Sequence, residues 1–97
     1  MNDTAKRWLF LATLMRFGMP REGVVWPPPK SPFPIGSIVT LKSYKWHPPG
    51  GVYVKGAANY GPGGVFSRGP HTDWLFAGES PLGWGATVLF TLDDIEL

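Results

Sequence analysis

The side chains that could perform acid–base or nucleophilic chemistry are few and do not form an ordered set. His71 lies two residues before Asp73, so an imidazole could meet a carboxylate, and Ser67 or Ser80 could serve as a nucleophile. No Gly-x-Ser-x-Gly string occurs, and Ser80 belongs to a Gly-Glu-Ser-Pro stretch typical of a polar turn. We therefore predict no catalytic residues and interpret the protein as a non-enzyme.

The sequence also offers too few ligand residues for a metal site and no complete motif for a nucleotide site. The chain has no Cys and two His, and no spacing of carboxylates completes a set of three ligands around His47 or His71. The pairs Gly50-Gly51 and Gly63-Gly64 could present backbone N–H groups to an anion, but no Gly-x-x-x-x-Gly-Lys-Ser/Thr string is present. We expect neither a metal nor a cofactor.

The most informative pattern is a sequence motif that occurs twice. Residues 49–56 read Pro-Gly-Gly-Val-Tyr-Val-Lys-Gly, and residues 62–69 read Pro-Gly-Gly-Val-Phe-Ser-Arg-Gly. Pro-Gly favours turns, and each copy has room for a short strand. Side chains two apart on a strand share a face, so each copy predicts an aromatic ring beside a cation. If the two strands lie together, an aromatic and basic binding surface results.

That surface, extended along the strand before it, gives the candidate partner-binding residues. They are Lys42, Tyr44, Trp46, Tyr53, Lys55, Phe66 and Arg68. Bases of a single-stranded nucleic acid stack on such rings while cations follow the phosphates. An acidic protein surface would suit the same residues, with Tyr, Trp and Arg as anchors. A third interpretation is ordinary cross-strand packing with solvated cations, and the sequence leaves all three open.

Composition indicates one small, loop-rich and mainly β domain. The 97 residues include 13 Gly and 11 Pro, which approach a disordered composition, but 14% aromatic residues are too much apolar surface for a disordered tail. A net charge of +2 is far below that of a dedicated duplex binder. The absence of Cys favours an intracellular, cytoplasmic location, and the apolar run 8–15 is too short to span a membrane.

Residues 1–18 predict an N-terminal helix over 3–17. Asn2 or Asp3 suits the N-cap, and Gly18 suits the stop. At 100° per residue, two apolar stripes lie side by side. The first stripe contains Trp8, Leu11, Ala12 and Met15, and the second contains Phe10, Leu14 and Phe17. Either the barrel and the following segment cover both stripes, or the second stripe meets another chain.

Residues 19–36 form a proline-rich connector, in which Val24-Val25-Trp26 suits a short edge strand. Successive prolines favour an extended, semi-rigid strap. Such a strap either wraps its own domain or serves as a ligand for a partner protein.

Residues 37–97 have the pattern of a small β-barrel. We expect strands at 37–44, 52–55, 65–68, 74–77 and 85–91, with Val39, Leu41, Val88 and Phe90 directed inward and Thr87 and Thr91 outward. Residues 92–97 predict a single helical turn followed by a hydrophobic anchor. Five short strands with turn residues between them are typical of a barrel.

The stretch Ile35-Gly36-Ser37-Ile38-Val39-Thr40-Leu41-Lys42-Ser43 resembles the opening strand of small SH3-like barrels of bacteria and their viruses, and residues 92–97 are similar to their closing turn. The resemblance implies an SH3-like barrel with an N-terminal helix, and no activity. We predict a non-catalytic module that docks on a larger protein assembly, as a viral accessory or structural component. The alternative is a single-stranded nucleic acid binding protein. No membrane partner is expected, and the oligomeric state is left open.

Overall fold

The structure is a computed structural model that describes residues 2–42, 51–62, 64, 73–80 and 87–96. It begins with helix α1, Asp3–Arg16, whose N-cap Asn2 accepts a hydrogen bond from the Ala5 N–H at 2.8 Å. Gly18 follows the helix with φ of +76°, the left-handed conformation that commonly ends a helix. The helix and its start and stop signals are therefore confirmed.

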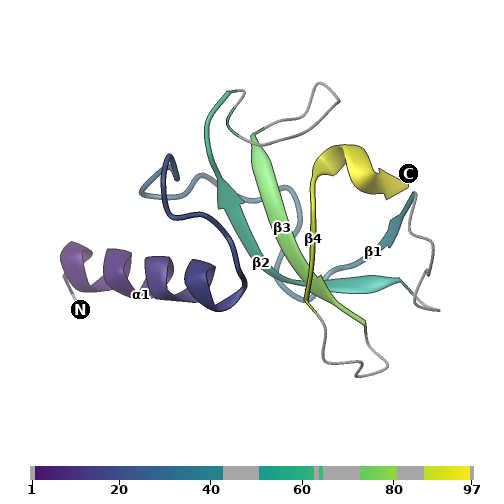
Figure 1. The fold of residues 1–97 in the computed structure, drawn as a ribbon, viewed down its shortest axis with the longest axis horizontal. Helices are drawn as coiled ribbons and strands as arrows, with labels where there is room; N and C mark the ends of the chain where they lie inside the picture. The colour runs from purple at the N-terminus through teal and green to yellow at the C-terminus, as the bar shows by residue number, and fades with distance from the viewer. Residues whose placement is uncertain (1, 43–50, 63, 65–72, 81–86, 97) are drawn as a thin grey trace.

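The remaining elements form a five-stranded antiparallel sheet. They are β1 (Ile38–Leu41), β2 (Val52–Asn59), β3 (Trp74–Glu79), β4 (Thr87–Phe90), the 3-10 turn η1 (Leu92–Asp94) and β5 (Ile95–Glu96). The strand order is β4-β3-β2-β1-β5, and the sheet curls into a half-barrel with α1 extending to one side (Figure 1). A small, mainly β fold with one N-terminal helix is confirmed.

Several elements differ from the predicted ones. β2 runs to Asn59 rather than ending at Lys55, because Gly56, Ala57 and Ala58 are small enough to continue the strand beneath α1. The segment Val24–Trp26 forms no strand, although the Val25 N–H donates to the Asn59 carbonyl at 2.7 Å. The short strand β5 follows the predicted helical turn, and the strand expected at 65–68 lies outside the described residues.

The interior of the half-barrel holds the main hydrophobic core. Its buried members are Val39, Leu41, Val52, Val54, Phe76, Phe90 and Ile95. Phe76 is fully buried and stacks between Trp74 and Phe90, with ring centroids 6.0 and 5.5 Å apart, while Phe33 meets its edge at 5.8 Å. Val39, Leu41 and Phe90 thus face inward as predicted, with Val88 packed against the core; Thr91 was predicted outward but is buried, because it caps η1.

A second core lies between α1 and the outer face of the sheet. Leu14 is buried there with Met19, Ala58, Tyr60 and Ala77. The fit is closest at Gly56, where a Cβ atom would come within 2.6 Å of the Phe17 ring. The last two turns of the helix therefore rest directly on β2 and β3.

The helix buries the second of its two predicted stripes. Leu14 is buried and Phe10 and Phe17 are half-buried, whereas Trp8 and Met15 of the first stripe are 64% and 56% exposed. The hypothesis that the second stripe meets another chain is therefore wrong, since the sheet covers it. Of the first stripe, Leu11 packs against the second core, whereas Trp8, Ala12 and Met15 stay exposed.

The connector contacts its own domain at several points. The Phe10 and Trp26 rings lie 5.3 Å apart, and the Tyr60 hydroxyl donates to the Pro20 carbonyl at 2.6 Å. Near the start of β1, the Gly36 N–H donates to the Val54 carbonyl at 2.7 Å. Within the described part of the chain, no helix is long and apolar enough to cross a bilayer.

Candidate functional surface

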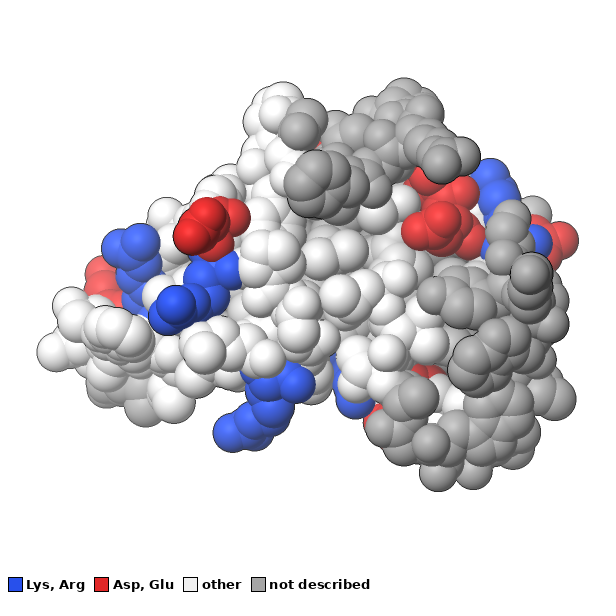
Figure 2. Space-filling view, in the orientation of Figure 1, with Lys and Arg blue, Asp and Glu red and all other residues white. Residues whose placement is uncertain are grey.

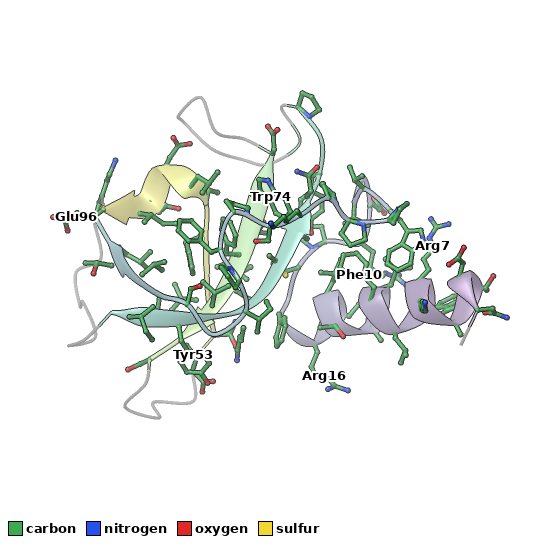
Figure 3. The ribbon with its side chains drawn as sticks, turned by 180° about the vertical axis from the view of Figure 1, so that it is seen from behind. Arg7, Phe10, Arg16, Tyr53, Trp74 and Glu96 are labelled. Carbon is green, nitrogen blue, oxygen red and sulfur yellow. The ribbon has the colours of Figure 1, made fainter. Side chains whose placement is uncertain are left out.

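One row of outward side chains crosses four strands of the sheet. Ile38 of β1 is in register with Tyr53 of β2, Tyr53 with Glu79 of β3, and Glu79 with Thr87 of β4. Their inward neighbours line the barrel core, so these four side chains face out. We call Ile38, Tyr53, Lys55, Glu79 and Thr87 the uncovered face, in which Ile38 and Thr87 are exposed while Tyr53, Lys55 and Glu79 are half-buried. In Figure 3, Tyr53 lies at the opposite end of the sheet from Trp74.

A polar cluster occupies the middle of this face. The Tyr53 hydroxyl donates to Oε2 of Glu79 at 2.7 Å, and Nζ of Lys55 lies 3.4 Å from the same oxygen. Nζ of Lys55 also lies 5.1 Å from the centroid of the Phe17 ring, at the end of α1. Lys55 reaches both partners because it is the extra residue of a β-bulge between Val54 and Gly56.

The hydrogen bond shifts the pKa of both partners in opposite directions. Accepting from the Tyr53 hydroxyl stabilises the charged carboxylate and lowers the pKa of Glu79; the Lys55 cation acts the same way, while partial burial opposes it. The pKa of Tyr53 is raised, first by donation to Glu79, then by burial and by the nearby negative charge. The carboxylate is ionised and the phenol protonated at neutral pH, so the cluster holds its members in place and offers no poised acid or base.

Only some of the predicted binding residues can be placed. Tyr53 and Lys55 lie together on the uncovered face, and Lys42 is exposed at the end of β1, where its N–H donates to the Asp94 carbonyl at 2.7 Å. The other four candidates lie outside the described residues; they are Tyr44, Trp46, Phe66 and Arg68.

Sequence reasoning missed Glu79, the acceptor that organises the cluster. The predicted strand ended at Ala77, whereas β3 continues to Glu79. Alternation along 75, 77 and 79 was the signal that could have found it, because it places Leu75, Ala77 and Glu79 on one face.

The structure also decides how the first copy of the repeat pairs. Tyr53 is in register with Ile38 on one side and with Glu79 on the other, so both edges of β2 are occupied there. The two copies were expected to lie together as strands. That pairing is not formed at Tyr53, because β1 and β3 already take up the backbone hydrogen bonds of this segment.

The residues considered for catalysis are not assembled in the part of the chain that the structure describes. Ser80 is buried, and the Asp73 carbonyl accepts a hydrogen bond from the Tyr60 N–H at 2.7 Å. His47, Ser67 and His71 lie outside the described residues. No group of three or more His, Cys, Asp or Glu side chains suited to a metal ion occurs among those described.

Comparison with known proteins yields no family model, curated protein or solved structure that matches this chain. The chain's own residues therefore carry the functional inference.

Proposed function

We propose that the protein is a non-catalytic binding module that docks on a larger protein assembly through the uncovered face. The observation that carries this proposal is the exposure of Ile38, an apolar side chain that lies beside Tyr53 on the outer side of the sheet. Sheet faces are ordinarily buried against another element, yet Ile38 is 57% exposed beside the ring of Tyr53. Exposed apolar groups gathered on one face mark contact with a partner.

The chemistry of this face suits a protein with an apolar centre and an acidic rim. Ile38 and the Tyr53 ring supply apolar contact, and the Tyr53 hydroxyl is already oriented by Glu79. Tyr combines a large apolar body with a polar tip, which makes it a frequent anchor of interfaces. The exposed Lys42 on β1 adds positive charge at the margin, where a partner's carboxylates would meet it.

An SH3-like barrel is the finer fold description that we propose. The 3-10 turn η1 directly before the last strand, β5, supports the likeness of residues 92–97 to a closing turn. Such a barrel identifies no activity, since one fold serves many functions. A viral accessory or structural component remains the proposed setting.

Single-stranded nucleic acid is the alternative ligand, and the described residues favour it less. Lys55 is paired with Glu79, so the repeat's cation has a carboxylate beside it. A phosphate chain following Lys55 would pass that negative charge, which opposes the electrostatic attraction on which such binding depends.

Capture of host proteins by the immobilised chain tests the proposal. The informative variant is Ile38→Asp, which places a charge at the most exposed apolar position of the uncovered face. Leu9→Asp is the matched control, because Leu9 is an aliphatic side chain of nearly equal exposure on α1. Wild type and Leu9→Asp should retain the same proteins, identified by mass spectrometry, and Ile38→Asp should lose them while keeping the wild-type melting temperature.

Two results would remove the proposal. Unchanged capture by Ile38→Asp would exclude the uncovered face as the docking site. Tight binding of a single-stranded oligonucleotide that weakens steeply with added salt, without protein capture, would establish the alternative.

A further inference from the structure

An apolar pocket with an acidic rim opens where α1 ends. Its volume is about 580 Å³, and it begins at Gly18, directly beyond the helix. Tyr60, Leu75 and Leu89 give it an apolar lining, and Glu22 and Asp94 also line it, although Oδ2 of Asp94 accepts hydrogen bonds from the N–H and the hydroxyl of Thr91. None of the described residues that line it carries a positive charge. A pocket of this size and lining suits an aromatic side chain with a cation beside it.

The same chain displays such a side chain on α1. Trp8 is the most exposed large hydrophobic side chain of the helix, and Met15 is also exposed, two turns further along the same stripe. Lys6 and Arg7 immediately precede Trp8, and all three are exposed. In Figure 2, an uncharged band runs from the helix onto the sheet, and Lys and Arg side chains gather above and below it at the helix.

We propose that two copies of this chain form a reciprocal dimer, in which Trp8 of each copy enters the Tyr60–Leu89 pocket of the other. Trp8 lies about 12 Å before the end of α1, at about 1.5 Å per residue. Two helices packed antiparallel therefore bring the N-terminal half of one beside the end of the other, which is where the pocket opens. A two-fold axis then makes both contacts at once.

Charge complementarity favours a second copy as the occupant. Arg7 flanks Trp8 on the helix and meets the pocket rim that carries Glu22 and Asp94, so each copy supplies both members of an attractive pair, whereas Lys6 lies on the far side of the helix from Trp8. A second copy therefore matches the pocket in charge as well as in apolar character.

The surface area that the contact would bury also favours a second copy of the chain as the occupant of the pocket. One Trp side chain buries roughly 150–250 Å², so a single insertion falls short of the about 800 Å² that each partner buries in a standard interface. In a reciprocal dimer, each chain buries both its exposed helix stripe and its pocket, so the area buried per partner comes closer to that of a standard interface. The dimer goes beyond the proposed docking function and leaves Ile38 and Tyr53 free.

Sedimentation velocity over a range of concentrations, with variants on each side of the contact, tests this arrangement. Trp8→Glu removes the inserted ring, and Leu89→Glu places a charge in the pocket. Both positions are exposed, so both variants should keep the wild-type circular dichroism and melting temperature. Each variant alone should raise the dimer Kd by about tenfold or more. Thr40→Glu, at an exposed position of β1, should leave it unchanged.

Mixing the two variants gives the decisive measurement. The Leu89→Glu chain retains its Trp8 and the Trp8→Glu chain retains its pocket, so a 1:1 mixture rebuilds one of the two contacts. Dimer should therefore form in the mixture at concentrations where each variant alone is monomeric. A wild type that stays monomeric at every concentration, a Trp8→Glu variant that still dimerises, or a mixture without rescue would each overturn the proposal. Ile38→Asp should still dimerise, which separates this result from the capture test.

Discussion

The hydroxyl of Tyr53 and the carboxylate of Glu79 face each other across β2 and β3 at 2.7 Å, in directly paired positions of the two strands. This bond fixes the orientation of the Tyr53 ring, which is half-buried on the outer side of β2. It also joins the first copy of the sequence repeat to a strand that begins more than twenty residues later in the chain. The position of the Tyr53 ring therefore depends on a partner outside the repeated motif.

Removing the hydroxyl should change the pH dependence of stability. In Tyr53→Phe, Glu79 loses the largest contribution that lowers its pKa from the ordinary 4.5. A lowered pKa gives stability that is present above the unfolded-state value and disappears as pH falls through the folded-state value. The variant should therefore lose less stability than wild type on acidification below about pH 4.5. Urea unfolding at several pH values measures this.

The loss of stability at alkaline pH provides the matching control. The raised pKa of Tyr53 gives stability that is present below its ordinary value of 10.0 and is lost as pH rises through the folded-state value. Tyr53→Phe should lack this loss, whereas Glu79→Gln should reduce it. Identical pH profiles for wild type and Tyr53→Phe would contradict the hydrogen bond.

A methyl group at position 56 should push α1 off the sheet. The Cβ atom of Gly56→Ala would lie 2.6 and 2.7 Å from two atoms of the Phe17 ring, closer than carbon atoms can approach. We expect a destabilisation of about 1–3 kcal/mol, measured by chemical unfolding. Phe17→Leu in the same chain should recover part of it, because the two sites share one contact. Equal stability of Gly56→Ala and wild type would refute this packing.

Truncation of Phe76 should be the most damaging change in the barrel. The side chain is fully buried and contacts the rings of Phe33, Trp74 and Phe90. Phe76→Ala should cost about 3–5 kcal/mol, a large part of the stability of a small domain. Thermal melting should show a much lower midpoint or no cooperative transition, whereas Thr87→Ala, at an exposed position, should melt like wild type.

The N-cap should control the order of the first helical turn. Asn2→Ala removes the acceptor for the Ala5 N–H and should destabilise the helix end by about 0.5–2 kcal/mol. Faster amide exchange in the first turn of α1, with unchanged exchange in β2 and β3, is the expected result. Asn2→Asp keeps an oxygen acceptor and should exchange like wild type. Unaltered exchange in Asn2→Ala would show that the cap does not hold this end.

Local signals in the sequence were sufficient for the helix and much of the sheet. Asn2 and Gly18 mark the ends of α1 because their roles depend on neighbouring residues alone. Alternation placed Val39 and Leu41 inward for the same reason. The extent of β2 could not be found this way, since Gly56 and Ala58 favour a strand only under the Phe17 ring and its neighbours.

The candidate surface depended on long-range information that the sequence does not contain. The motif predicted Tyr53 and Lys55 on one face, but it gave no indication that Glu79 joins them from another strand. The choice between the two helix stripes was also undetermined. Trp8 and Phe10 are equally apolar in a helical projection, and only the position of the sheet decides which one is covered.

The bulge at Lys55 divides β2 into two half-strands of opposite phase. Before it, Val52 and Val54 point into the barrel; after it, Ala57 does so, while Ala58 turns to the helix. If plain alternation continued through Lys55 without the bulge, every later side chain of the strand would point to the opposite face. The extra residue in β2 therefore determines which of its small residues face α1, and with them the place on the sheet where the helix packs.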